Sequence, residues 1–490
     1  MKLKQRYAYQ FAVYHPAVVS QFNRSLFPEW PLAFVAVAMA KHLTRGASDI
    51  FASVVYDEKV KDTLVGVYIV PFLYFREVLD LELVRQRLLE KLMPIARFRS
   101  RVESVPGPLG CNSVYVELDR KTMEASLSEL VSAPAGLTTE ADLNRFVSGL
   151  YGQTWDPALP LWRAYVINHL EDGRSLLMMK IDHAMADGVA LLDVLYHIID
   201  SYDGPVIEMK SARSPSADSG CFDCDSCLLH LQGWWRAIWK PFIGELLPGD
   251  PPNRLKFKDA KVAGRTKAVA STPGIDLEEI KAIKSKIRGA TVNDVLMTLM
   301  CLTLRKYFQR YEPSTLKQSV TATIPVSVRR EGEEDIFNPM FFGNNFSQAQ
   351  ISFPLEVEDP MEAFRRVKSQ IDVIKVSPEP HLRLGLISCL TSCAVPQSLL
   401  ASAMMDQFGR VTATLSNVIG PLREVQFLGQ AVDDLSFYAM VPLGLYLGVV
   451  QYKGRIKVGI CCDGELEPEP TRLAECWEEA LQSLKAAAGR

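Results

Sequence analysis

The chain has 490 residues, of which 48% are hydrophobic and 23% charged, and its formal net charge is −3. This is the composition of a folded globular protein, and the length exceeds the size at which one hydrophobic core usually stops growing, so two domains are expected. The absence of a long basic run argues against a partner nucleic acid. We therefore expect a packed two-domain protein that does not bind nucleic acid.

The N-terminal residues favour an intracellular protein. Residues 1–10 begin with basic residues but continue with polar and aromatic ones, unlike the apolar core of a signal peptide. The most apolar stretches, residues 30–40 and 65–75, are about half the roughly 20 residues that cross a bilayer. We therefore expect no transmembrane helix, and we expect the ten cysteines to remain thiols in a reducing compartment.

The first half of the chain combines helices and strands. Residues 81–93 have apolar side chains at helical spacing, and residues 111–118 alternate as a strand does. Residues 175–181 are an apolar run typical of a buried strand, and residues 189–199 return to helical spacing. A strand, a tight loop and a helix are therefore expected to meet around residue 183.

Polar segments rich in proline, glycine and serine divide the chain. They lie at residues 211–220 and 248–253, so residues 205–265 are interpreted as a connection between an N-terminal domain (1–204) and a C-terminal domain (266–490). The second half is expected to contain helices at 291–308 and 471–486 and strands at 319–328, 411–418, 443–450 and 454–461. Mixed elements in both halves indicate an α/β or α+β fold.

Asp182, His183, Asp187 and Gly188 are the first candidate site, at the expected junction of strand and helix. A histidine is suited to general-base work because its unperturbed pKa lies near neutral pH. Asp187 can cap the helix, and Gly188 allows close approach of backbone or substrate. Taken alone, this short pattern more often marks a buried structural histidine beside a helix cap. A zinc site is not expected, because no second histidine or cysteine stands at ligand spacing from His183.

The segment Asp182–Gly188 (DHAMADG) resembles the signature H-H-x-x-x-D-G of the bifunctional wax ester synthase/diacylglycerol acyltransferases, with Asp182 in place of the first histidine. This family belongs to the superfamily of CoA-dependent acyltransferases and peptide-synthetase condensation domains. The resemblance extends over residues 81–464. Further blocks follow in the family's order: ARFRSRV (96–102), PLW (160–162), Asn293-Asp294, IPVSVR (324–329) ahead of Gly343-Asn344, and SNVIGP (416–421).

The resemblance implies two chloramphenicol-acetyltransferase-like domains with the active site in a channel between them. It implies transfer of a fatty acyl group from acyl-CoA, a substrate rather than a cofactor, to a long-chain alcohol or diacylglycerol. His183 would then be the general base. No metal and no other cofactor is expected.

The resemblance also assigns supporting residues. Ser416 and Asn417 are candidates to stabilise the oxyanion, although a polar strand end before a Gly-Pro turn is an equally good explanation. Asn293 and Asp294 are expected to hold a helix start rather than to touch substrate. An arginine partner for Asp187 cannot be chosen from spacing.

Asp182 and Ile419 are the departures from the family pattern. If the first family histidine orients its neighbour, Asp182 can replace it as a structural or electrostatic partner; if that histidine contacts substrate, activity or acceptor choice would change. Ile419 stands where the family often has proline. Two alternatives therefore stay open. One is an acyltransferase acting on another alcohol or amine, and the other is a non-catalytic lipid-binding protein, which Asp182 would favour.

Residues 221–253, like the first 80 residues, match the family pattern poorly. Cys221, Cys224 and Cys227 have a C-x-x-C-x-x-C spacing, but neither a zinc nor an iron–sulfur pattern is completed, and S-acylation of these cysteines is an alternative. Residues 228–247 place apolar side chains at helical spacing beside cations, which suits either a lipid surface or packing against the two domains. The apolar positions are Leu231, Trp235, Trp239 and Phe242, and Pro241 is expected to interrupt the helix. A cytoplasmic protein in peripheral contact with a membrane, such as the endoplasmic reticulum, or with lipid droplets is therefore expected.

Overall fold

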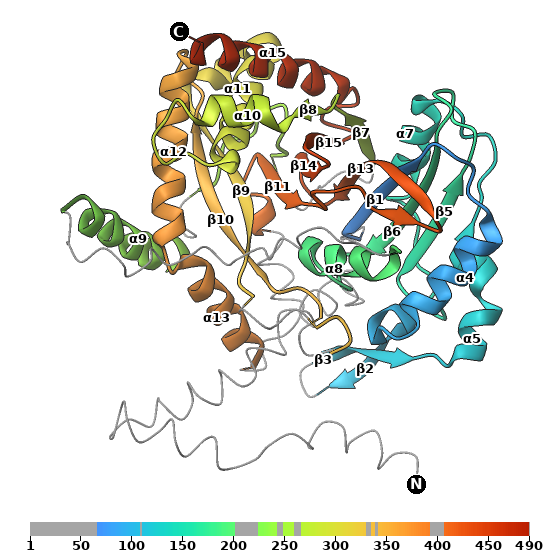
Figure 1. The fold of residues 1–490 in the computed structure, drawn as a ribbon. Helices are drawn as coiled ribbons and strands as arrows, with labels where there is room; N and C mark the ends of the chain where they lie inside the picture. The colour runs from blue at the N-terminus through green and yellow to red at the C-terminus, as the bar shows by residue number, and fades with distance from the viewer. Residues whose placement is uncertain are drawn as a thin grey trace, which may run out of the picture.

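Two large β-sheets, a two-stranded hairpin and the helices that pack against them form the described part of the molecule (Figure 1). The computed structural model describes residues 66–107, 110–200, 224–242, 248–258, 266–329, 335–338, 342–392 and 406–489. Within these ranges helices and strands alternate along the chain, as the mixed α/β prediction requires. Residues 1–65, Cys221 and much of the expected connection lie outside the described residues.

The first sheet has the strand order β12-β13-β1-β6-β5-β4. Its central strand β1 comes from an apolar run in which all but Pro71 are buried, and it pairs antiparallel with both β6 and β13. Strands β12 and β13 come from the C-terminal half of the chain, so both halves build this sheet. The strands are β1 (Tyr68–Phe75), β4 (Val131–Ser132), β5 (Trp162–Ile167), β6 (Ser175–Asp182), β12 (Gln426–Phe427) and β13 (Gln430–Met440).

The second sheet has the order β10-β9-β11-β14-β15-β7, with β8 paired to β15. Buried side chains of the long helices α11, α12 and α15 form one hydrophobic core with it. The predicted strands at 319–328, 411–418, 443–450 and 454–461 are all present within two residues of their expected ends. The strands are β7 (Lys267–Ser271), β8 (Ile275–Asp276), β9 (Ser319–Ser327), β10 (Phe346–Pro354), β11 (Ala413–Ile419), β14 (Leu445–Tyr452) and β15 (Arg455–Asp463).

The helices confirm most of the periodicity predictions. Those expected at 81–93, 189–199, 291–308 and 471–486 are α4, α8, α11 and α15, and the strand expected at 111–118 is one arm of the hairpin β2 (Ser100–Gly107) and β3 (Gly110–Glu117). The helices are α4 (Leu81–Leu92), α5 (Arg120–Ala125), α6 (Leu127–Leu130), α7 (Glu140–Gly149), α8 (Gly188–Ile198), α9 (Cys224–Phe242), α10 (Leu277–Lys284), α11 (Val292–Tyr311), α12 (Pro360–Val376), α13 (Glu379–Ser392) and α15 (Thr471–Ala488).

The two sheets meet where β13 crosses β14 and β15. Gly448 and Gly459 face each other in the β14–β15 ladder. A Cβ atom on Gly459 would lie 2.1 Å from the carbonyl oxygen of Phe437, and one on Gly448 would lie 2.8 Å from the Phe437 ring. Only glycine allows β13 to approach this closely, so these two positions bring the first sheet against the second.

Helix α9 occupies part of the amphipathic segment expected at residues 228–247. Its described part, Cys224–Phe242, includes Pro241, and residues 243–247 lie outside the described residues, so the expected interruption at Pro241 stays a prediction. Among the described residues, no helix is long and apolar enough to cross a membrane.

Candidate active site

The predicted strand, loop and helix around His183 are present. Strand β6 ends at Asp182, and α8 begins at Gly188. Asp187 caps α8: its Oδ1 accepts hydrogen bonds from the backbone N–H groups of Val189 and Ala190 at 3.1 and 3.0 Å. This is the capping role that the sequence indicated for Asp187.

Gly188 begins α8 close to strand β11 of the second sheet. A Cβ atom there would lie 3.3 Å from a methyl group of Val418. The missing side chain therefore keeps the helix start, and with it His183, near β11. This is the close approach for which the sequence suggested a glycine.

The His183 imidazole is held by Asn344, which lies between strands β9 and β10. The amide Nδ2 of Asn344 donates to the carbonyl oxygen of His183 at 2.6 Å, so its Oδ1 faces His183 Nδ1 at 3.0 Å. An oxygen acceptor at that position assigns the proton to Nδ1. Nε2 is then the ring nitrogen with the lone pair, which is the state a general base requires.

Arg329 is the arginine partner of Asp187, which spacing alone did not reveal. The guanidinium NH1 lies 2.8 Å from Asp187 Oδ2, and both side chains are at most 7% exposed. Asp187 Oδ2 also accepts from the N–H of Asn345 at 2.8 Å, while Arg329 NH2 donates to the carbonyl of Gly343 at 2.6 Å. A buried ion pair thus joins α8 to the segment that contains Asn344.

Two further carbonyl groups of the loop accept hydrogen bonds from side chains in the first half of the chain. Arg97 donates to the carbonyl oxygens of Ala184 and Met185 at 3.1 and 3.4 Å, and the Tyr115 hydroxyl donates to Ala184 at 2.9 Å. The Arg97 guanidinium lies 4.7 Å from the centre of the Tyr115 ring. The loop is therefore held from two sides, which fixes the position of the imidazole.

Asp182, the main departure from the family signature, lies beneath the loop. Its side chain is fully buried; Oδ1 accepts from the N–H of Ala184 at 2.9 Å and Oδ2 from Trp155 Nε1 at 2.8 Å. Burial lowers the pKa of neighbouring Lys180 to about 8, while the charge of Asp182 opposes this shift. Asp182 is not among the described residues that line the pocket beside His183. Its carboxylate therefore supports the loop that carries His183 and does not face the pocket.

Replacing Asp182 by alanine is expected to lower the free energy of unfolding by about 1–3 kcal/mol for each donor left without an acceptor. Trp155→Phe removes only one donor and is expected to cost less. Urea unfolding measures both variants. A stable Asp182→Ala protein with an altered KM for the acceptor would instead place this carboxylate in contact with substrate.

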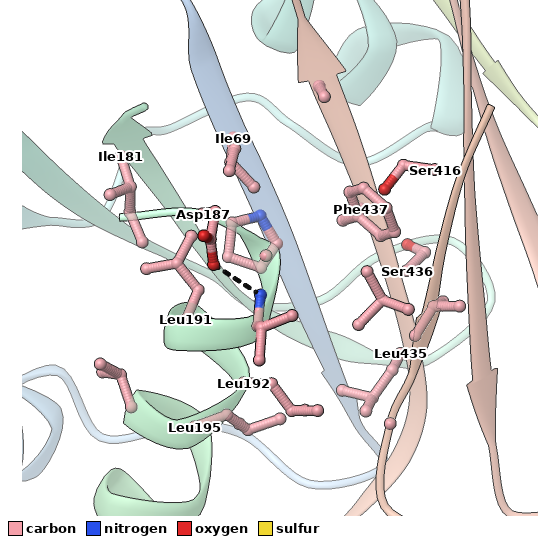
Figure 2. A pocket seen from close by; sticks show the side chains of 18 of the residues that line it. Ile69, Ile181, Asp187, Leu191, Leu192, Leu195, Ser416, Leu435, Ser436 and Phe437 are labelled. Carbon is pink, nitrogen blue, oxygen red and sulfur yellow. Dashed lines mark hydrogen bonds between the residues drawn. The ribbon is translucent and has the colours of Figure 1, made fainter. Parts of the chain in front are cut away.

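An apolar pocket lies between α8, β1 and β13 of the first sheet and β9 and β11 of the second. Figure 2 shows Leu191, Leu192 and Leu195 of α8 on one side and Leu435 and Ser436 of β13 on the other. The polar side chains among the lining residues are few: His183, Asp187, Ser327, Ser416, Asn417, Ser436 and Tyr446. An apolar cavity with a few convergent polar groups is typical of a site for a lipid-like ligand.

Strands β9 and β11 separate beside this pocket. They pair in parallel only through Ala322↔Ala413 and Thr323↔Thr414, after which β9 continues with β10 and β11 with β14. Beyond this point Pro325 and Ser416, from the two separated strands, both line the pocket. Pro325 has no N–H group, so at that position β9 leaves no donor unpaired.

The structure brings some of the predicted site residues together and not others. Ser416 and Asn417 line the same pocket as His183, and Ser416 is a hydrogen-bond partner of the buried Tyr446 hydroxyl. Asp294 is instead the third residue of α11, where it forms a capping box with Thr291 and an ion pair with Lys375 at 3.1 Å. Asn293 lies in the same first turn. Neither belongs to the pocket lining.

His183 has the electrostatic properties of a base. Burial lowers the pKa of its imidazole below the ordinary value of 6.5, although the Asp187 charge and the Asn344 hydrogen bond act in the opposite direction. A lowered pKa keeps the imidazole neutral at pH 7. Among the described residues, no group of three His, Cys, Asp or Glu side chains is arranged to hold a metal ion.

The pH dependence should follow from this lowered pKa. For a mechanism in which neutral His183 is the base, kcat/KM is expected to persist as the pH falls through 6.5 and to decline only below the lowered pKa. Thiol release measured between about pH 5 and 8 gives the midpoint of this acidic limb. A midpoint above 6.5 would contradict the assignment.

Comparison with known proteins shows two matching family models. Residues 75–232 match the wax ester synthase/diacylglycerol acyltransferase catalytic domain, and residues 342–485 match the WS/DGAT C-terminal domain. Two relatives from Arabidopsis thaliana are wax ester synthase/diacylglycerol acyltransferases 5 and 1. The first is 22% identical over 466 residues, covering 85% of this chain and 90% of the relative. The second is 26% identical over 381 residues, covering 70% and 75%.

Solved structures show the same fold. The wax ester synthase/diacylglycerol acyltransferase from Marinobacter aquaeolei VT8 superposes with a TM-score of 0.57 at 18% identity, covering 87% of this chain and 96% of that one. The first condensation domain of the calcium-dependent antibiotic synthetase gives 0.55 at 14% identity, covering 91% and 95%. The fold is thus the mixed α/β fold of two chloramphenicol-acetyltransferase-like subdomains. The chain belongs to the wax ester synthase/diacylglycerol acyltransferase family.

Proposed function

We propose that this acyltransferase moves a fatty acyl group from acyl-CoA to the hydroxyl of a long-chain alcohol or of diacylglycerol, with His183 as the general base. The main support is one observation: Asn344 holds His183 in a single tautomer at the wall of an apolar pocket. The position of Asp182 outside the pocket lining weakens the case for a non-catalytic protein.

In the proposed reaction the acceptor hydroxyl donates its proton to Nε2 of His183 while its oxygen attacks the thioester carbonyl. The carbon–sulfur bond then breaks, and the CoA thiolate takes the proton back from the imidazolium. No covalent acyl-enzyme is required. Asp187 and Arg329 position the loop rather than exchange protons.

The oxyanion of the tetrahedral intermediate needs hydrogen-bond donors. Ser416 and Asn417 are the proposed donors because both line the pocket with His183. They lie on β11 beyond the point where it stops pairing with β9. One such donor contributes about 10²–10³ in kcat in comparable sites. Because β9 and β11 are no longer paired at this position, a substrate can lie between them.

The hydrocarbon chain of one substrate is proposed to lie along α8. Leu191, Leu195 and Ile198 recur at helical spacing on the pocket side of this helix. Both substrates are poorly soluble in water, so the proposal places the reaction at the cytoplasmic surface of a membrane or lipid droplet.

Leu195→Trp is expected to shift the preference toward shorter acyl-CoA. The larger side chain excludes two methylene groups of the acyl chain from the pocket, so the binding free energy weakens by about 1.6 kcal/mol. For palmitoyl-CoA this is roughly a tenfold loss in kcat/KM. Octanoyl-CoA should be little affected, because it does not reach as far. Leu83→Trp, on the exposed side of α4, is the control; equal losses for both acyl chains would refute this placement.

The decisive assay is release of free thiol from palmitoyl-CoA, followed together with the lipid product. Hexadecanol, diacylglycerol and hexadecylamine are offered separately as acceptors. We expect thiol release to depend on an alcohol acceptor and to match the ester formed. Release without acceptor contradicts direct transfer, and an amide product would establish the alternative amine acceptor.

A further inference from the structure

Helix α9 packs against the segment between α12 and α13 through small residues on one side. Gly233 and Ala237 are buried, and the carbonyl of Gly233 accepts a hydrogen bond from Ser377 Oγ at 2.8 Å. A Cβ atom on Gly233 would lie 3.0 Å from a methyl group of Val376 at the end of α12. The glycine therefore allows α9 to pack directly onto the chain between α12 and α13.

A buried ion pair fixes the rotation of α9 about its axis. Nε of Arg236 lies 2.5 Å from Oε2 of Glu379, whose side chain is fully buried at the start of α13. Arg236 also donates to the carbonyl of Gln350 on β10, and Arg383 pairs with the other oxygen of Glu379 at 2.9 Å. The one charged side chain in the middle of α9 is thus directed inward.

The outer side of α9 is apolar. Five side chains at helical spacing are each more than half exposed, from 55% for Ile238 to 67% for Leu231. They are five of the nine exposed large apolar side chains in the described part of the chain, so they form a cluster. We call them the α9 outer face: Leu228, Leu231, Trp234, Trp235 and Ile238.

This arrangement is the reverse of a surface helix in a water-soluble protein, which turns its apolar side inward. Two tryptophans beside aliphatic side chains are typical of a helix lying at the boundary between lipid headgroups and acyl chains. The stretch 228–240 contains no acidic residue, which favours an anionic lipid surface over a basic partner. In Figure 1, α9 lies at the edge of the molecule.

A protein partner fits the α9 outer face less well. A stable protein interface uses about 20–30 residues on each side, whereas this face offers five side chains on one projecting helix. A lipid surface needs no complementary shape. It can take up such side chains to a depth of about 5–10 Å.

We propose that the α9 outer face docks the enzyme on the phospholipid surface of a membrane or lipid droplet, with α9 parallel to that surface. The choice of lipid rests on the proposed function, whose substrates dissolve in such a surface. The Arg236–Glu379 pair then determines which side of the protein faces the lipid. Docking delivers the second sheet, and the pocket beside it, to the layer that contains the substrates.

Vesicle flotation of the full chain tests this proposal. The vesicles are phosphatidylcholine alone or with phosphatidylserine, and the test variant is Trp234→Ser/Trp235→Ser. The matched control is Val78→Ser/Leu83→Ser, which removes two equally exposed apolar side chains elsewhere. We expect the wild type and the control to float, and the partition coefficient of the tryptophan variant to fall at least about tenfold. Phosphatidylserine in the vesicles should strengthen binding of the wild type.

Three results would overturn the proposal. They are a wild type that stays at the bottom of the gradient, a tryptophan variant that floats as the wild type does, and a wild-type dimer that this variant alone converts to monomer. Circular dichroism establishes that both variants are folded. Thiol release from palmitoyl-CoA with hexadecanol, both dispersed in detergent without vesicles, is measured in parallel: flotation without release refutes only the proposed function, and release without flotation refutes only the docking face.

Discussion

His183→Ala is expected to lower the rate of acyl transfer from palmitoyl-CoA to hexadecanol by about 10²–10⁴. Among the described residues that line the pocket, the alanine removes the one imidazole, so the acceptor hydroxyl loses its proton acceptor and the departing thiolate its proton donor. Because the neighbouring polar groups bind substrate without exchanging protons, kcat should fall more than KM rises. Thiol release under saturating substrate measures the effect.

His197→Ala is the matched control for this prediction. His197 lies near the end of α8, the helix that follows the His183 loop, and its Nε2 is hydrogen-bonded to the carbonyl of Lys91 at 2.9 Å, but it is not among the described residues that line the pocket. Its replacement should change kcat less than twofold. Equal kcat in His183→Ala and the wild type would remove His183 from the mechanism.

Arg329→Met is expected to lower the free energy of unfolding by about 3–5 kcal/mol, because it leaves the buried Asp187 carboxylate without its cationic partner. The same change removes the hydrogen bond from Arg329 to the carbonyl of Gly343, which precedes Asn344, the residue that binds the imidazole. Activity per folded molecule should therefore fall as well. Urea unfolding and thiol release at the same temperature measure the two effects.

The control for this variant is Arg76→Met. Arg76 pairs with Asp433 at 3.1 Å, but its side chain is 76% exposed, so the loss should stay below about 1 kcal/mol. If Arg329→Met costs no more than Arg76→Met, the buried pair is not what joins the two halves of the site.

Local patterns were sufficient to predict elements whose stability comes from one periodic face. Helices α4 and α15 each bury one stripe, whereas α11 is buried on all sides over residues 294–304 and was marked by its length and its cap. Helices α4 and α11 begin at the capping residues Asp80 and Thr291. The four strands of the second sheet that were predicted alternate or run apolar over their full length. In these segments short-range sequence and tertiary burial favour the same structure.

Strands β1 and β13 were not predicted, for different physical reasons. The apolar run of β1 is buried on both faces, and such a run has no period that separates strand from helix. Strand β13 contains Asp433 and Asp434 and is only partly buried, and its partner β1 lies more than 350 residues away in the chain. Pairing over such a separation has no local signature.

The candidate site likewise contains residues that local patterns predicted and residues that they did not. The positions of Asp187 and Gly188 followed from the expected helix start, and both lie where that start requires. The contact between His183 and Asn344 spans 161 residues, so Gly343-Asn344 and Arg329 were visible only as family blocks without an assigned chemistry. Trp155, which binds Asp182, had no sequence signal that we identified.

The strand order of the first sheet has a consequence for synthesis on the ribosome. Strand β6 is complete at residue 182, but β13, the other neighbour of β1, ends at residue 440. At the usual elongation rates this interval is roughly 13–50 s. Throughout it the nascent chain exposes an apolar strand with one unpaired backbone edge, which is a template for wrong pairing. Chaperone protection is therefore needed most between the emergence of these two segments from the exit tunnel.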